Sequence, residues 1–146
     1  MQSLPLSTFA RRRDDFDDEP TPVIETIGAL VRGPAVTVSR GTPVTALRRM
    51  FVDLRVSAIA VADAQDTLCG LVTRTDVLRT SGDDATAGDA MSGCVFALPS
   101  YAPIAKAAAL IGYEGVGQIV VTDRDGSLVG IVSSVDLVRY FATSKP

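Results

Sequence analysis

The sequence predicts an α/β fold built from two similar repeats that pack about a pseudo-twofold axis. The main evidence is an internal duplication. When the chain is shifted by 60 residues, residues 26–79 align with residues 86–139 without a gap, and 13 of these 54 positions are identical. Each half also contains apolar residues at helical spacing, followed by two short and nearly continuous apolar runs. Such runs are typical of strands buried on both faces, so each repeat should contribute a small sheet to a shared core.

The elements of the first repeat follow in order from its sequence. Its opening segment is compatible with a helix or a short strand. Thr42-Pro43 then predicts a helix start, with the threonine as N-cap and the proline in the first helical position. The buried stripe of this helix should consist of residues at helical spacing, namely Val44, Leu47, Phe51 and Leu54. Strands are expected over 59–62 and 68–72, joined by a polar turn at 63–66, and Thr73 should cap a helix over 74–79.

The second repeat predicts the same series of elements. A helix is expected over 103–111, strands over 118–122 and 128–132, and a helix capped by Ser133 that runs to Phe141. The chain is accordingly divided into a flexible N-terminal tail at 1–22, a first repeat at 23–82 and a second repeat at 83–146. Because a unit of about 60 residues is marginally stable alone, the repeats should pack sheet against sheet and form two symmetry-related clefts.

We also expect a homodimer. A chain of 146 residues should cover only one face of the sheet pair. Apolar helix surfaces such as Leu137 and Phe141 would then remain for a second copy to cover.

The composition argues against several classes of function. The chain has no histidine, which excludes Ser-His-Asp and Cys-His catalysis as well as histidine zinc sites. The acidic residues form no paired catalytic constellation. The two cysteines, Cys69 and Cys94, lack zinc-ligand spacing and are interpreted as small buried hydrophobes. We therefore expect no catalytic residues, no metal site and no enzymatic activity.

Charge and hydropathy restrict the partners and the location. The net charge is −3 and the arginines form no basic stripe, so nucleic acid is not expected as a partner. No apolar run approaches the roughly 18–20 residues of a membrane span, and the N-terminus lacks the order of a secretory signal. We therefore expect a cytoplasmic protein without a membrane partner.

The strongest local signal occurs where each second apolar run meets the following helix. Thr73 and Asp76 in the first repeat correspond to Ser133 and Asp136 in the second. A helix start offers free backbone N–H groups to an anion, and an aspartate can accept hydrogen bonds from a ribose diol. The same Thr/Ser-x-x-Asp spacing also forms a capping box that merely closes the helix. Spacing alone leaves both interpretations open.

Two segments of the chain resemble the signature of CBS domains. In the first repeat the resemblance lies in residues 56–63 and 68–76, and in the second it lies in residues 116–123 and 128–136. The likeness covers about residues 24–142 and occurs twice at regular spacing. It implies two intertwined α/β repeats that commonly dimerise. It also implies that the chain binds AMP, ATP, S-adenosylmethionine or a similar ligand as a regulatory sensor.

The resemblance implies that each cleft combines residues of both repeats. Carried over, the nucleotide-binding residues of one cleft are Thr73, Arg74, Thr75, Asp76, Ala107, Val116 and Gly117. Those of the other cleft are Ser133 and Asp136, facing Thr42, Leu47, Val56 and Ser57. Some family members place His or Arg where this chain has Ser57-Ala58 and Gly117-Gln118, which predicts weak polyphosphate binding. The hydroxyls of Thr73 and Thr75 and the charge of Arg74 favour the cleft around Asp76 as the tighter one.

The predicted function is that of a stand-alone, non-enzymatic CBS-type pair that binds AMP, ATP or another adenosyl compound. No tightly bound cofactor is required, and the regulated protein partner is unidentified. The alternative is a ligand-free scaffold for dimerisation or interaction, and an enzyme of unusual chemistry is a third hypothesis. The presence of both Asp76 and Asp136 favours binding, because a pure scaffold needs neither.

Overall fold

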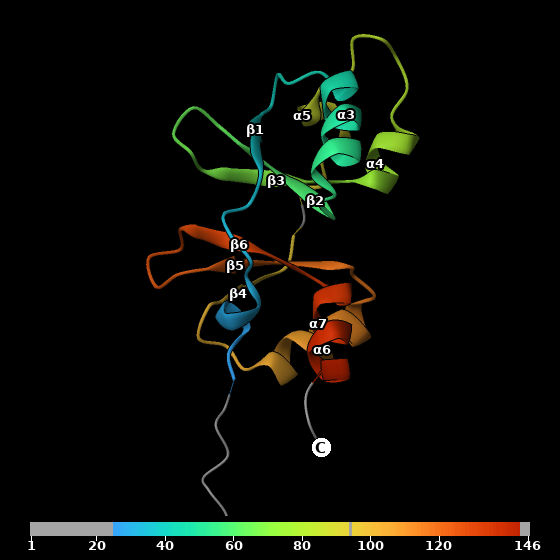
Figure 1. Ribbon diagram of the computed structural model, residues 1–146. Coiled ribbons are helices and arrows are strands. Elements are labelled where there is room, and N and C mark those ends of the chain that lie inside the picture. Colours follow the sequence, from blue (N-terminus) through green and yellow to red (C-terminus); the bar gives the residue numbers. More distant parts are fainter. Residues whose placement is uncertain (1–24, 94, 144–146) are drawn as a thin grey trace, which may run out of the picture.

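The computed structural model describes residues 25–93 and 95–143, which form two halves of the same design (Figure 1). The first half contains the 3-10 turn η1 (Ile27–Leu30), β1 (Thr37–Ser39), α3 (Val44–Leu54), β2 (Ala58–Ala62), β3 (Leu68–Thr73) and α4 (Arg74–Arg79). The second half contains α5 (Ala87–Ala90), β4 (Ala97–Pro99), α6 (Ile104–Glu114), β5 (Gln118–Thr122), β6 (Leu128–Ser133) and α7 (Ser134–Thr143). The predicted tail at 1–22 lies outside the described residues.

Each half contains a three-stranded sheet with the same topology. In the first sheet the order is β1-β2-β3, with β1 parallel to β2 and β2 antiparallel to β3. The second sheet repeats this order as β4-β5-β6. Even the register corresponds, since Val61 pairs with Gly70 and Val121 pairs with Gly130, followed in both sheets by an irregularity. The structure therefore confirms the duplication at the level of individual strand pairs.

The two sheets lie face to face in the middle of the molecule, and helices cover their outer faces (Figure 1). Ala60, Leu71 and Val120 form the core between the sheets. Two further cores lie outside this layer, one between the first sheet and α3, α4 and α5, the other between the second sheet and η1, α6 and α7. The predicted α/β fold of two packed repeats is confirmed. The expectation that one chain covers only one face of the sheet pair was wrong, because both outer faces carry helices.

The opening turn of each repeat packs on the other repeat. The backbone N–H groups of Ile27 and Gly28 donate to the carbonyl oxygens of Ala102 and Ser100, at 2.8 and 2.9 Å. In the same way, residues 87 and 88 of α5 donate to the carbonyls of residues 42 and 40, at 2.7 and 2.9 Å. The first element, which the sequence left open, is thus a helical turn followed by a short strand. Because of this exchange neither repeat completes its core alone.

The helix α3 differs in two details from its prediction. Its N-cap is Pro43 and not Thr42, because the proline is extended (φ −63°, ψ 141°) and its carbonyl accepts the first helical hydrogen bonds. Val44, Leu47 and Phe51 are buried as expected, but Leu54 in the last turn is 50% exposed. α6 departs from its prediction in the same way, since it begins at Ile104 with Pro103 as N-cap. α4 and α7 begin directly after Thr73 and Ser133 as predicted, and α6 and α7 extend beyond their expected ends to Glu114 and Thr143.

None of the helices in the described ranges has the length and apolar character that a membrane crossing requires.

Candidate functional site

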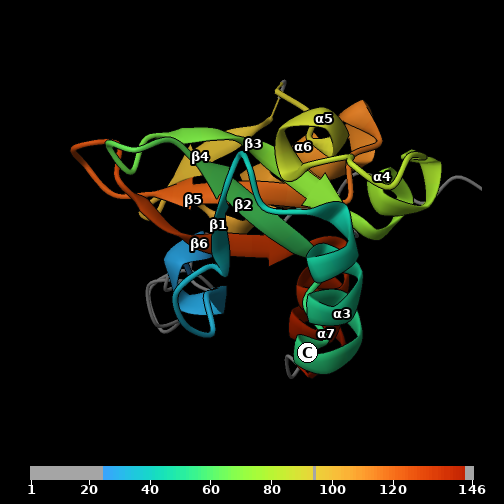
Figure 2. The same ribbon diagram turned by 90° about the horizontal axis from the view of Figure 1, so that it is seen from above.

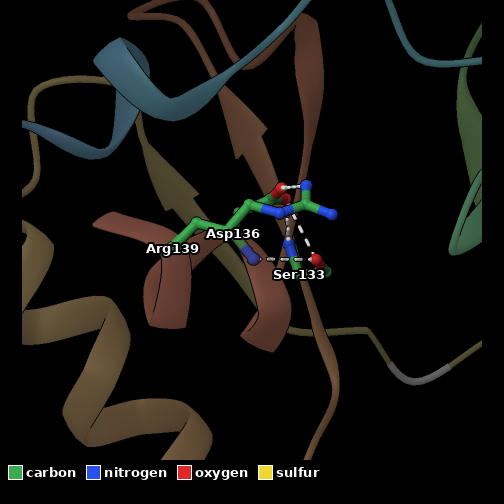
Figure 3. A network of polar contacts seen from close by, with 3 residues as sticks. All are labelled: Ser133, Asp136 and Arg139. Atoms are coloured by element: carbon green, nitrogen blue, oxygen red, sulfur yellow. Dashed lines mark hydrogen bonds and ion pairs between the residues drawn. The ribbon is translucent and has the colours of Figure 1, made fainter. Parts of the chain in front are cut away.

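An aspartate in the first helical turn closes both strand-to-helix junctions in the same way. At the β3–α4 junction, the Asp76 Oδ2 atom accepts hydrogen bonds from Thr73 N at 2.8 Å and Thr73 Oγ1 at 3.0 Å. At the β6–α7 junction, Asp136 Oδ2 accepts from Ser133 N at 2.8 Å and Ser133 Oγ at 3.0 Å (Figure 3). Each aspartate N–H bonds back to the hydroxyl, at 3.3 and 3.2 Å. Both motifs therefore form capping boxes.

Capping uses only one oxygen of each carboxylate. Within the described residues, Asp76 Oδ1 accepts no hydrogen bond and has no ion-pair partner. Asp136 Oδ1 lies 3.9 Å from Arg139 Nη1, and the guanidinium group lies beside the carboxylate in Figure 3. The Asp136 side chain is 20% exposed. A carboxylate oxygen is a strong acceptor, so capping leaves Oδ1 able to bind a ligand hydroxyl.

A cavity of about 430 Å³ opens beside the carboxylate of Asp136, and we call it the Asp136 pocket. Its wall is formed by the linker before β1, the end of α3 and the β6–α7 junction. The lining residues are Arg32, Gly33, Pro34, Ala35, Val36, Arg55, Val56, Ser57, Ala58, Arg74, Ile131, Ser133, Val135, Asp136 and Arg139. Both repeats thus contribute to one cavity, and Val56, Ser57, Ser133 and Asp136 all belong to its lining.

Apart from Asp136, the charged residues of this lining are four arginines, Arg32, Arg55, Arg74 and Arg139. Arg74 was expected in the cleft of Asp76, and this expectation was wrong: its Nη2 donates to the Val56 carbonyl oxygen at 3.0 Å and it lines the Asp136 pocket. The reason is helical geometry. Residues two apart on a helix point to opposite sides, so Arg74 and Asp76 face different pockets.

The corresponding cavity beside Asp76, which we call the Asp76 pocket, has a volume of only about 200 Å³. It is lined by Leu71, Thr73, Asp76, Ser92, Val95, Phe96, Val116, Gly117 and Gln118. Thr73, Asp76, Val116 and Gly117 all belong to this lining, but no lysine or arginine does.

Each pocket is bordered by the segment that leads into the first strand of a repeat, and these two segments run differently. At the Asp76 pocket the backbones of Leu71 and Ser92 exchange hydrogen bonds of 3.1 and 2.9 Å, which hold the segment before β4 against β3. Gly70 permits this approach, because a Cβ atom there would collide with the Ser92 carbonyl oxygen. At the Asp136 pocket the side chain of Val31 occupies the space over Gly130. The described residues form no bridge there that corresponds to Leu71–Ser92, and the pocket stays wider.

Four residues expected in the clefts lie outside both linings. Leu47 and Ala107 are fully buried on the helix faces that cover their own sheets. The Thr42 Oγ1 atom lies 3.1 Å from Ser39 Oγ, away from the Asp136 pocket. Thr75 is exposed and does not line the Asp76 pocket.

A third cavity of about 790 Å³ lies at the opposite ends of the sheets, between the two hairpin turns. It shares Pro34 and Ala35 with the Asp136 pocket, and its charged lining residues are Asp66 and Asp125. Hydrogen bonds with the Asp123 side chain and then with Ser127 lower the pKa of Asp125 to about 2. Asp125 is therefore ionised at neutral pH, which disfavours an anion at this end. The described carboxylates form no cluster suited to a metal ion.

Three of the four arginines, namely Arg32, Arg55 and Arg139, were not predicted from the sequence. A signal for two of them was present in the duplication. A shift of 60 residues pairs Arg32 with Ser92 and Arg55 with Gly115, so the repeats differ in charge beside segments that they otherwise share. Under the same shift Arg139 aligns with another arginine, Arg79, which lines neither junction pocket.

Solved structures with the same fold include several CBS proteins. CBSX2 in complex with AMP is 24% identical over 81% of this chain and 96% of that chain, with a TM-score of 0.71. The CBS domain pair of MJ0100, in complex with 5′-methylthioadenosine and S-adenosyl-L-methionine, is 19% identical over 84% and 100%, with a TM-score of 0.77. An uncharacterized conserved protein from Pyrococcus horikoshii is 16% identical over 86% and 98%, with a TM-score of 0.76. These likenesses show the fold.

No curated protein matches the chain. The family model described as CBS domain matches it twice, at residues 27–83 and 87–143, and so covers most of its length. The two matches correspond to the two halves of the fold and confirm the resemblance seen in the sequence. The chain therefore belongs to the CBS-domain family and carries a tandem pair of CBS domains.

Proposed function

We propose that this CBS-domain pair is a regulatory module that binds an adenosine-containing ligand in the Asp136 pocket. The observation that carries the proposal is the pocket itself, in which a carboxylate of the second repeat faces Val56 and Ser57 of the first, with arginines around them. Its volume of about 430 Å³ falls within the range of roughly 300–1,000 Å³ that is usual for small-molecule sites.

The chemistry of the lining suits the parts of a nucleoside. Asp136 Oδ1 can accept hydrogen bonds from both hydroxyls of a ribose, while Oδ2 continues to cap α7. Val36 and Ile131 line the pocket from the two repeats and offer apolar surface to a flat base. Such sites combine mostly apolar walls with a few oriented polar groups. We assign the ribose to Asp136 and the base to the wall between Val36 and Ile131.

The ligands of similar structures support this assignment. CBSX2 was solved with AMP, and the MJ0100 pair with 5′-methylthioadenosine and S-adenosyl-L-methionine. These ligands share adenosine and differ in the group attached to it. We therefore propose adenosine as the recognised element. The Asp76 pocket, with Thr73, Val116 and Gly117, would be a second and weaker site. This reverses the expectation that the Asp76 cleft binds more tightly, because Arg74 and Thr75, on which that expectation rested, do not belong to its lining.

We further propose that the module acts on another protein as a homodimer and not by catalysis. Both α3 and α7 lie on the same side of the molecule (Figure 2). Their exposed apolar residues include Val52 at 76%, Val138 at 65% and Phe141 at 56%. A second copy of the chain would remove this surface from water.

Light scattering coupled to size exclusion tests the dimer, and we expect a mass of about twice 15.3 kDa. The variant V138D/F141D should be a monomer. Leu78→Asp serves as the control, because Leu78 is 85% exposed but belongs to α4. A monomeric wild-type protein would contradict the proposal.

Native mass spectrometry of freshly purified protein tests the ligand. We expect an added mass from a bound compound. Denaturation should release this compound, and its ultraviolet absorbance should be that of adenine. The alternative function, a ligand-free dimerisation scaffold, is favoured by the capping role of both aspartates. A protein that carries no adenine compound, and that binds neither adenosine nor AMP by calorimetry, would support that alternative.

A further inference from the structure

We propose that the four arginines make the Asp136 pocket selective for the diphosphate or triphosphate of adenosine, over AMP and over uncharged or cationic adenosyl compounds. This inference rests on the proposed function, since it presupposes an adenosine ligand beside Asp136. It concerns the group attached to the ribose, which the fold and the family leave open.

The first observation is the state of the four side chains. Arg74 Nη2 donates to the Val56 carbonyl oxygen at 3.0 Å, and Arg139 Nη1 lies 3.9 Å from Asp136 Oδ1. Arg32 and Arg55 line the same cavity, and neither has a hydrogen-bond or ion-pair partner among the described residues. The lining therefore carries four positive charges against the single carboxylate of Asp136. An anionic ligand would balance this excess of positive charge.

The number of arginines exceeds what one phosphate can use. A terminal phosphate presents three acceptor oxygens, and two arginines that bind in the bidentate mode already occupy them. The pocket offers four guanidinium groups from the linker, the end of α3, the start of α4 and α7. Each guanidinium carries five N–H donors, so Arg74 and Arg139 keep donors for a ligand beside their present contacts. A chain of two or three phosphates can therefore use all four groups, whereas a monophosphate cannot.

The second observation is the backbone at Arg55. This residue ends α3 in the left-handed region, with φ 54° and ψ 35°. Its counterpart Gly115 ends α6 with φ 68° and ψ 22°. Glycine adopts this conformation at little cost, whereas a residue with a Cβ atom does so under strain. A strained arginine at the wall of a pocket, where the other repeat has glycine, indicates that its side chain serves the pocket.

The Asp76 pocket provides an internal comparison. Under the 60-residue shift, Arg32, Arg55 and Arg74 correspond to Ser92, Gly115 and Ser134. The same fold therefore forms a capped junction without these three charges, and they are not a requirement of folding. At its other end the Asp136 pocket adjoins the cavity of Asp66 and Asp125. Phosphates are thus directed toward the arginines and away from the hairpin turns.

The proposal replaces the expectation of weak polyphosphate binding. That expectation rested on Ser57-Ala58, which occupy the positions where some family members place His or Arg. In this chain the charges come from neighbouring segments, with Arg55 two positions before Ser57 and Arg32 in the linker.

Calorimetry with adenosine, AMP, ADP and ATP, without magnesium, tests the selectivity of the wild-type chain. We expect ATP to bind at least about 10-fold more tightly than AMP at low salt, because each charge-assisted hydrogen bond adds affinity. The ratio should shrink between about 0.05 M and 0.5 M salt, since salt screens exposed charges.

The variant R32S/R55G/R74S replaces three arginines by the residues of the other repeat. It should lose about 10-fold or more in affinity for ATP, while affinity for adenosine changes by less than about 3-fold. The control R40S/R49S/R79S removes three exposed arginines that do not line the pocket, and it should bind ATP like the wild type.

The outcomes separate this inference from the proposed function. Equal affinity of the wild type for AMP and ATP, or an unchanged ATP affinity in R32S/R55G/R74S, overturns the selectivity while adenosine binding stands. Equal losses in R32S/R55G/R74S and in the control also overturn it, because net charge alone would then explain the effect. If no adenosine compound binds at all, the proposed function fails and the selectivity fails with it.

Discussion

The Asp136 pocket and the Asp76 pocket descend from the same repeat, yet they differ in size and charge. Their cavities measure about 430 and 200 Å³, and four arginines line the first while none line the second. The capping hydrogen bonds beside them are nearly identical in length. The strand-to-helix junction is thus a constant part of the scaffold. The pockets differ in the segment that leads into β1 or β4, and in the residue that ends α3 or α6, which is Arg55 in the first repeat and Gly115 in the second.

This comparison shows how a duplicated fold can specialise one of its two sites. Few positions need to change, because the junction already supplies a capped helix start and a carboxylate. At the Asp76 pocket a backbone bridge to Ser92 narrows the space. At the Asp136 pocket the segment before β1 meets Gly130 of β6 mainly through the Val31 side chain, and four arginines belong to the lining. Among the described residues, the wider pocket is the one without a backbone bridge between this segment and the sheet.

The largest expected effect comes from replacing each of the two aspartates by alanine in a separate variant. Asp136→Ala should weaken binding of an adenosine ligand by roughly 10- to 150-fold, as expected for the loss of about 1.5–3 kcal/mol of charged hydrogen bonds. Asp76→Ala is the matched control, because it removes the same capping box. Both variants should lose about 1 kcal/mol of stability. Calorimetry and urea denaturation measure the two quantities, and a stronger loss of binding in Asp76→Ala would reverse the assignment of the pockets.

A second comparison uses the glycines under the linker. A Cβ atom at Gly70 would collide with the backbone of Ser92, whereas one at Gly130 would mainly meet the side chain of Val31. A backbone bridge cannot move without losing its hydrogen bonds, but a side chain can rotate. We expect Gly70→Ala to lower the free energy of unfolding by about 3 kcal/mol and Gly130→Ala by about 1 kcal/mol. Equal losses in denaturant titrations would show that the linker approaches both sheets in the same way.

The smallest expected effect has the opposite sign. Arg55→Gly should raise the free energy of unfolding by about 0.5–1 kcal/mol, because relief of the left-handed strain outweighs the greater entropy of glycine in the unfolded chain. Gly115→Ala should instead destabilise the protein by about 1 kcal/mol. A thermal unfolding series compares the two. A destabilised Arg55→Gly variant would mean that the arginine side chain contributes more to folding than its strain costs.

Much of the fold was predictable because its signals are local. The helix over 74–79 and the strand over 118–122 were predicted with their observed bounds. A hydroxyl cap and a polar turn fix such ends within a few residues. The exchange of the opening turns was not predictable in this way. Ile27 N donates to the carbonyl oxygen of Ala102, about half the chain away in sequence, and only the packed structure shows that pairing.

The candidate site was predictable to a smaller extent. The duplication and the family resemblance led to Asp76, Asp136, Ser133 and the facing residues Val56 and Gly117, and the structure places these in the two pockets. The arginines were missed because their contribution depends on the direction of long side chains and on the path of the linker. Neither property follows from a periodic pattern.

We propose that the adenosine ligand occupies the Asp136 pocket in preference to the Asp76 pocket. A titration with ATP followed by amide chemical shifts in NMR tests it most directly, because the two pockets offer matched reporters. Ser57 and Ala58 line the first pocket at the positions that Gly117 and Gln118 occupy in the second. We expect the amides of Ser57 and Ala58 to shift and saturate while those of Gly117 and Gln118 stay nearly unchanged. Shifts that begin and saturate first at Gly117 and Gln118 would contradict it.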